Sequence, residues 1–204
     1  MLNIEPINKA RIAAGFLTVE ETVALMDNGN LIPDPFSTLV SRNVLLGENN
    51  LIYPGVTLQA SGEGKVVIGN GNVFHSGTMI DASHGRIEIG SDNQFGEGGF
   101  TAKANQPGAD IHIGSVCRFL NNPSVFGKTR LEDGSQLLGN ITVVSCLLKA
   151  GGSHRTPDPE LRAGLLKGFG TAQNLTVNQG HVIAGNGSFS QENSVPQSTY
   201  HPKR

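Results

Sequence analysis

The chain has 204 residues, a formal net charge of −2 and a pI near 6.3, a size that fits one domain with short appendages. Its 15 basic residues nearly balance its 17 acidic residues. This balance excludes the strongly basic surface that nucleic acids select, so no nucleic-acid partner is expected. With 27 glycines and only 16% charged residues, the composition favours a turn-rich, regular backbone over a helical bundle.

No stretch of the sequence approaches the ~20 apolar residues that a membrane span requires, so no span is expected. The first residues, Met1 to Pro6, lack the basic start and apolar segment of a secretory signal, which makes the cytoplasm the default location. The two cysteines, Cys117 and Cys146, are too few for a disulfide framework and are expected to be buried.

The first 37 residues are expected to form a helical cap over the first coil of the fold. Thr18 and Glu21 have the spacing of a capping box, which predicts a helix over residues 20–27 that ends at Asn28-Gly29. Val19, Val23 and Met26 are predicted to share the buried face of this helix.

Large apolar residues then recur at every sixth position. The longest series is Ile113, Phe119, Val125, Leu131, Leu137 and Val143, and the same spacing links Val40 to Leu58, Ile68 to Ile80, and Val177 to Val195. A step of six fits neither a helix nor simple strand alternation, so each apolar residue marks one short strand followed by one corner. Three such sides form a coil of 18 residues. The sequence therefore predicts an all-β parallel β-helix solenoid.

Asparagine or a small residue often stands two positions before the apolar residue, as at Asn50, Asn72 and Asn93. Because asparagine tolerates the left-handed backbone region, these residues are predicted to form the corners.

The segments IGNGNV, IGSDNQ and IGSVCR resemble the hexapeptide-repeat family over roughly residues 38–196. This resemblance implies a left-handed coil and a homotrimer.

Insertions interrupt the count after Leu58, after Ile80 and after Thr101, and all three are predicted to leave the solenoid at one corner. The largest interruption covers residues 149–170 and includes a predicted helical turn from Pro157 to Gly168. We expect His84, His112 and His154 to gather at the same corner as the insertions, with His84 and His112 about 5 Å apart along the axis. A loosely held tail is predicted from Gln191 onward, with residues 197–204 outside the solenoid.

Two further segments carry a resemblance to acyltransferases. The string from His112 to Ser115, followed by Asn121, is similar to the acetyltransferase domain of bifunctional N-acetylglucosamine-1-phosphate uridyltransferases. This implies His112 as a general base and Asn121 as a substrate contact. Leu120 replaces the basic residue of that family, so a sugar phosphate is not predicted.

Residues 182–189 resemble the closing coil of hexapeptide acyltransferases. The resemblance implies that Ala184, Gly185 and Gly187 contact the pantetheine arm of an acyl-CoA. The same residues also suit a terminal cap of the solenoid.

The first functional hypothesis is therefore an acyltransferase that moves an acyl group, by preference acetyl from acetyl-CoA, to a hydroxyl or amine of a small molecule or sugar. The family resemblance implies a site at the interface between subunits of the trimer. His112, or otherwise His154 or His84, would be the base. Lys149 and Arg155 would meet an anionic acceptor or the CoA phosphates. Amides beside Gly114, Gly151 and Gly152 are candidate oxyanion donors.

Two other hypotheses share the fold. The γ-class carbonic anhydrases, which the repeat also resembles, bind zinc with three histidines, but their pair of histidines five positions apart is missing here, so no metal is expected. A non-catalytic trimeric scaffold is the third hypothesis. The sequence contains no glycine-rich nucleotidyltransferase loop, which excludes uridyl transfer.

Overall fold

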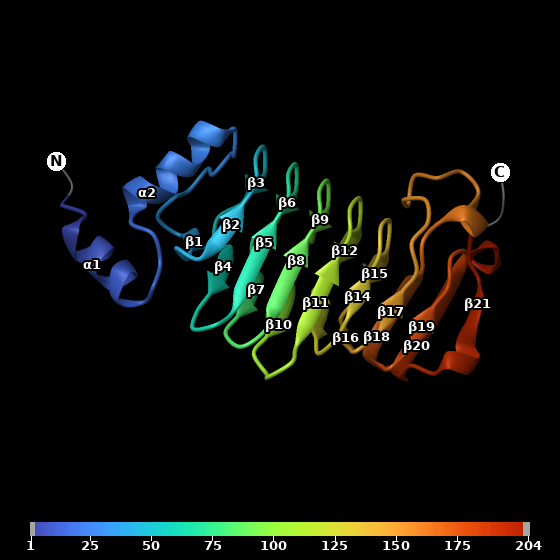
Figure 1. Cartoon of the computed structure of the whole chain (residues 1–204). Helices are drawn as coiled ribbons and strands as arrows, with labels where there is room; N and C mark the ends of the chain where they lie inside the picture. Colours follow the sequence, from blue (N-terminus) through green and yellow to red (C-terminus); the bar gives the residue numbers. More distant parts are fainter. Residues whose placement is uncertain (1–2, 202–204) are drawn as a thin grey trace.

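The computed structural model describes residues 3–201, and its main body is a left-handed parallel β-helix with three walls, as predicted (Figure 1). The first wall contains β2 (Val44–Leu46), β5 (Lys65–Ile68), β8 (Arg86–Ile89), β11 (Asp110–Ile113), β14 (Arg130–Leu131), β17 (Leu147–Leu148) and β19 (Thr176–Val177).

The second wall follows the first along each coil. It contains β3 (Leu51–Ile52), β6 (Val73–Phe74), β9 (Gln94–Phe95), β12 (Arg118–Leu120), β15 (Gln136–Leu138) and the first halves of β18 (Leu165–Gln173) and β20 (His181–Ser188).

The third wall completes the coil. It contains β1 (Leu39–Val40), β4 (Thr57–Ala60), β7 (Thr78–Ala82), β10 (Phe100–Ala104), β13 (Ser124–Phe126), β16 (Ile141–Val144) and the second halves of β18 and β20.

The core is the stack of sixth-position residues. Ile113, Phe119 and Val125 line the inside of three consecutive walls and are fully buried. Each of them stacks on the corresponding residue of the next coil, so that Phe119 lies in register with both Phe95 and Leu137. The predicted six-residue spacing of core residues does not extend to Val195. This residue belongs to β21 (Ser194–Pro196), which pairs antiparallel with β20 and closes the last coil.

Buried asparagines support the corner between the first and second walls, but in a different way from the prediction. Asn50, Asn72 and Asn93 do not have the left-handed backbone; the residues before them in the corner do, among them Asn49 and Asp92. The buried asparagines instead form a ladder, in which the Asn72 Nδ2 donates to Asn50 Oδ1 and the Asn93 Nδ2 donates to Asn72 Oδ1. Asparagine is needed here for hydrogen bonding between coils.

The N-terminal segment covers the first coil with α1 (Glu5–Ala13), α2 (Val19–Ala24) and η1 (Leu25–Asn28). The Thr18 capping box and the left-handed Gly29 at the end are confirmed. The Leu17 N–H donates to Val40 O, which ties the segment to β1. Helix α1 has no counterpart in the sequence prediction.

The predicted buried face of the second helix is wrong in part. Val19 is buried, but Val23 and Met26 are 44% and 38% exposed, and Thr22 is fully buried in their place. The reason is Arg11 of α1, whose guanidinium donates to Thr22 Oγ1 at 2.8 Å. This polar contact between the two helices turns Thr22 inward.

The three short insertions leave the solenoid between the third and first walls, as predicted; they connect β4 to β5, β7 to β8 and β10 to β11. The long insertion does not share this corner. It connects β17 on the first wall to β18 on the second, and it is the orange loop at the upper right of Figure 1. The expectation of a single corner for all insertions is therefore wrong.

The long insertion is also shorter than predicted, because β18 begins at Leu165. Leu166 lies in register with Leu137 and is fully buried, so this leucine belongs to the core of the second wall. The expected helical turn is limited to η2 (Pro159–Leu161) and ends at Arg162 instead of Gly168.

Residues from Gln191 to His201 are packed against the solenoid and do not form a loose tail. They include η3 (Gln191–Asn193), β21 and η4 (Gln197–Thr199). Gln197 is fully buried, and its Nε2 donates to Ala163 O at 2.6 Å. The predicted tail residues Lys203 and Arg204 lie outside the described residues. None of the helices between residues 3 and 201 is long and apolar enough to cross a membrane.

We predict that Asn72→Ala lowers the free energy of unfolding by about 3 kcal/mol, because it leaves the buried Asn93 N–H and Gly90 carbonyl without their side-chain partner. Chemical denaturation measures this change. The control is Asn70→Ala, which removes an exposed side chain that accepts from the Glu48 N–H. Equal losses in the two variants would contradict a structural role for the ladder.

Val116 has a φ of +53° and is 41% exposed, which makes it a β-branched residue in the left-handed region. We predict that Val116→Asn raises the free energy of unfolding by about 1 kcal/mol, because asparagine adopts this backbone at lower cost. Thermal denaturation measures the gain, with Val67→Asn on an extended strand as the control. A lower melting temperature for Val116→Asn would refute the strain.

Candidate functional site

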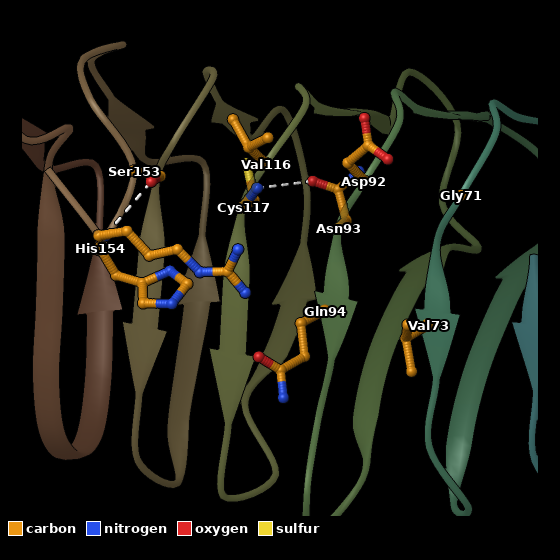
Figure 2. Close-up of a pocket in the computed structure, with 10 residues that line it drawn as sticks. Gly71, Val73, Asp92, Asn93, Gln94, Val116, Cys117, Ser153 and His154 are labelled. Carbon is orange, nitrogen blue, oxygen red and sulfur yellow. Dashed lines mark hydrogen bonds between the residues drawn. The ribbon is translucent and has the colours of Figure 1, made fainter.

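A pocket of about 590 Å³ lies between the long insertion and the outer surface at the corner of the first and second walls (Figure 2). Three kinds of residue line it: corner residues, outward residues of the second wall, and the tip of the insertion. They are Gly71, Val73, Asp92, Asn93, Gln94, Val116, Cys117, Ser153, His154 and Arg155. Figure 2 shows His154 on the insertion, facing the strands that carry Gln94 and Val73.

Backbone hydrogen bonds close the long insertion into a narrow loop. The Gly152 N–H donates to Leu161 O, and Gly152 O accepts from the Ala163 N–H. Farther out, the Arg162 Nε donates to Thr156 O at 2.7 Å. Gly152 is required by this closure, because a Cβ there would lie 2.2 Å from Thr156 Oγ1. These bonds hold Ser153, His154 and Arg155 over the second wall.

His154 is a partly buried histidine with a lowered pKa. Its pKa is lowered first by burial and then by the positive charges of Arg118, Arg155 and Arg162. Its Nδ1 atom is buried without a hydrogen-bond partner. An imidazole with a lowered pKa at the side of a pocket is suited to accept a proton at neutral pH.

His112 lies on a different surface. It is the outward residue of β11 on the first wall, in register with Glu88 and Arg130, and it does not line the pocket. Its Nδ1 is 3.8 Å from Glu88 Oε2, beyond hydrogen-bond distance. The structure therefore gives His112 a carboxylate neighbour but no enclosed site within one chain.

His84 is exposed in the loop between β7 and β8, at the corner of the third and first walls. It precedes β8, whereas His112 lies in register with Glu88 within the wall, so the two histidines lie at different places on the surface. The predicted cluster of His84, His112 and His154 does not exist within the chain.

Asn121, Ala184, Gly185 and Gly187 lie along the corner between the second and third walls. Asn121 is exposed with a φ of +65°. It belongs to a coil three strand spacings from β20, roughly 14 Å away. A Cβ at Gly185 would lie 2.8 Å from the ring of Phe189, so this glycine has a packing role in the terminal coil.

The two basic residues predicted for the site are in different places. Lys149 does not line the pocket, and its Nζ lies 3.6 Å from Glu132 Oε1. Arg155 does line the pocket. The proposed oxyanion donors are unsuitable in this conformation, because the N–H groups of Gly114, Gly151 and Gly152 donate to Leu131 O, Asp133 O and Leu161 O. These N–H groups already form hydrogen bonds in strand pairing and in the closure of the loop.

Sequence reasoning missed Gln94, Val116, Arg118 and Arg162. Gln94 and Arg118 each precede a buried sixth-position residue, so the repeat itself places them on the outer surface of the second wall. The sequence does not show which wall the long insertion covers. Gln94 and Arg118 lie near a pocket only because the insertion covers the second wall.

The described residues give no support to cysteine or metal chemistry in the pocket. Burial raises the pKa of Cys117 to about 12, so its thiol stays protonated at neutral pH. Within residues 3–201, no three histidine, cysteine, aspartate or glutamate side chains gather as a metal-binding group.

Comparison with known proteins gives one informative match. The chain is similar to the bifunctional protein GlmU of Clostridium acetobutylicum, with 28% identity over 170 residues that cover 80% of this chain. The chain spans about a third of the length of that protein, 34%. No family model matches. The match and the parallel coils together support a distant relationship with the transferases that the hexapeptide repeat resembles.

Proposed function

We propose that the protein is an acyltransferase that moves an acyl group, acetyl in the simplest case, from acetyl-CoA to a hydroxyl or amine of a small molecule. The observation that carries the proposal is His154, a histidine with a lowered pKa that lines a pocket of about 590 Å³ on a β-helix similar to GlmU. The pocket supplies two things that acyl transfer requires of the protein: a histidine that can act as the base, and a recess for the acceptor.

In this proposal His154 takes the proton of the acceptor hydroxyl or amine as the acceptor attacks the thioester carbonyl. The carbon–sulfur bond then breaks, and the CoA thiolate leaves with a proton returned by the imidazolium. Burial and the neighbouring arginines lower the pKa of His154, which favours its unprotonated form before the reaction. Gln94 is a polar side chain on the facing strand that can orient the acceptor.

We further propose that the active protein is a homotrimer. The hexapeptide-repeat resemblance supports this, as does the open side of the pocket, which lies on the outer surface of the solenoid where another subunit can contribute. His112 and the segment from Ala184 to Gly187 are then candidates for contacts with the acceptor or acetyl-CoA across a subunit boundary.

We predict that acetyl-CoA at millimolar concentration raises the melting temperature of the protein, since a ligand that binds only the folded state stabilises it. Thermal-shift measurement with acetyl-CoA, and with adenosine as a non-thioester control, tests this. Absence of any shift with acetyl-CoA would favour the non-catalytic scaffold.

We predict that His154→Ala lowers the rate of acyl transfer by about 100-fold or more without lowering the melting temperature, because it removes the base and no structural hydrogen bond. His181→Ala is the matched control, a histidine that bonds Gln179 O outside the pocket. Loss of activity in His112→Ala together with full activity in His154→Ala would contradict the assignment of the base.

The pH dependence provides an independent test. A histidine base is active when unprotonated, so the rate falls as the pH drops through its pKa. Because this pKa is lowered from 6.5, we predict that the acid limb of kcat/KM lies below pH 6.5. Arg155→Gln removes one of the positive charges that lower the pKa of His154. The acid limb of kcat/KM is therefore expected to move to higher pH in this variant.

We predict that light scattering gives a particle mass of three times the 21.5 kDa chain. A mass of one chain at working concentration would exclude the trimer.

A further inference from the structure

The tip of the long insertion, residues 153–156, lies over the pocket, and in the described part of the chain all of its hydrogen bonds stay within the insertion. The Arg155 and Thr156 N–H groups both donate to Ser153. The Thr156 carbonyl accepts from the Arg162 Nε at 2.7 Å. None of these bonds reaches the second wall. The position of the proposed base, which belongs to this tip, therefore depends on how the rest of the insertion is held.

The part of the insertion that follows the tip is held by the C-terminal end of the chain. Its short helix η2 contacts η4. The Ser198 Oγ in η4 donates to Glu160 Oε1 in η2 at 2.9 Å, and the Gly180 N–H donates to Arg162 O at 2.7 Å. Two segments that are almost 40 residues apart in the sequence thus meet beside the last coil.

Gln197 is the buried member of this contact. Its side chain is fully buried, and its Nε2 donates to Ala163 O at 2.6 Å and to His181 O at 3.3 Å. One amide group therefore joins η4 to the end of the insertion and to the start of β20. Both partners are carbonyl oxygens, so the side chain must be a donor. Its own Oε1 is buried without a partner, which leaves these two bonds as its polar contribution.

Closure of the last coil does not by itself require the contact with the insertion. β21 pairs with β20 and closes the second wall. Gln191 of η3 bonds both the N–H and the carbonyl of Thr176 in β19, at 2.9 and 2.8 Å, and so joins the same segment to the first wall. Gln191 and Gln197 thus both attach the C-terminal segment, but only Gln197 also bonds the insertion.

The burial of the second wall shows where this support ends. The outward residues nearest the last coil are at most 4% exposed: Gln136, Leu165 and Val182. Gln94 and Arg118, farther along the same column, are half-buried. The wall is therefore covered at its C-terminal end, and the pocket begins where the cover ends.

We propose that Gln197 is a positioning residue, which holds the long insertion against the last coil and thereby sets the place of His154 over the second wall. Gln197 does not line the pocket and acts through the insertion. The inference rests on the proposed function for the role of His154, whereas the support of the insertion by Gln197 does not depend on that function. Without the two Nε2 bonds, η2 is free to separate from η4, and the tip moves with it.

Amide hydrogen exchange, measured by NMR on the full chain, tests the support of the insertion without any substrate. Gln197→Met keeps the approximate length of the side chain and removes both donors. The amides of Gly152 and Ala163, which close the insertion, should exchange at least tenfold faster, because local opening of the insertion becomes easier. The Gln94 amide, which donates to Cys117 O within the solenoid, should exchange as before. Unchanged exchange in the insertion would overturn the proposal.

Two further variants separate this effect from a general loosening of the last coil. Gln191→Met should speed exchange of the Thr176 amide and leave the amides of the insertion unchanged. Ser198→Ala, which removes the bond to Glu160 on the surface, should speed exchange in the insertion by a smaller factor than Gln197→Met, and it keeps the test valid if Gln197→Met does not fold. Equal effects of Gln191→Met and Gln197→Met on the insertion would contradict the assignment.

An NMR titration of His154 reports on the position of the imidazole itself. Burial and the charges of the neighbouring arginines lower the pKa of His154. An insertion that is no longer held exposes the imidazole, so Gln197→Met should raise this pKa toward 6.5 and Gln191→Met should leave it unchanged. The same pKa in the wild type and in Gln197→Met would refute the positioning of His154.

The kinetic test uses the double variant. Gln197→Met should lower kcat about tenfold in the wild type and have no further effect in His154→Ala, because a positioning residue acts through the group that it positions. Equal losses in both backgrounds would indicate a general structural role and overturn the proposal. A wild type without acyltransferase activity, in which exchange and the pKa of His154 respond as stated, would refute the proposed function and leave the positioning of His154 by Gln197 supported.

Discussion

Stacking of buried apolar side chains in register from coil to coil is the constraint on which the rest of the protein depends. Each wall must place one such residue over its neighbours, as Phe119 lies between Phe95 and Leu137. Strand alternation then directs the preceding residue outward. The outer surface is therefore a set of columns whose order follows from the core, and insertions are tolerated only at the corners, where they do not shift the register.

The candidate site follows from this constraint. The second wall presents Val73, Gln94 and Arg118 in adjacent coils as one outward column. The long insertion leaves the corner beside that column and carries His154 over it. Neither part forms a site alone, because the column is an open surface of side chains and the insertion is a narrow loop. The cavity exists because the two meet.

Electrostatics distinguishes this place from the rest of the surface. On the first wall, Arg86 pairs with Glu88 of the same strand and Arg130 with Asp110 of the adjacent coil. Around His154, burial and then the positive charges of Arg118, Arg155 and Arg162 lower the pKa of the histidine. The perturbed pKa of a histidine at a pocket is a feature typical of functional sites.

The spacing of apolar residues by itself determined the three-walled coil, because only one geometry buries a side chain at every sixth position. It also identified the corner of the short insertions. It did not determine where the long insertion leaves, because Leu165 and Leu166 read equally well as loop or strand until Leu166 is paired with Leu137. It also could not show that His84, His112 and His154 lie on separate surfaces, or that Arg118 lies beside His154. The positions of these residues relative to one another depend on which wall the long insertion covers. Only the packing of the folded chain determines that wall.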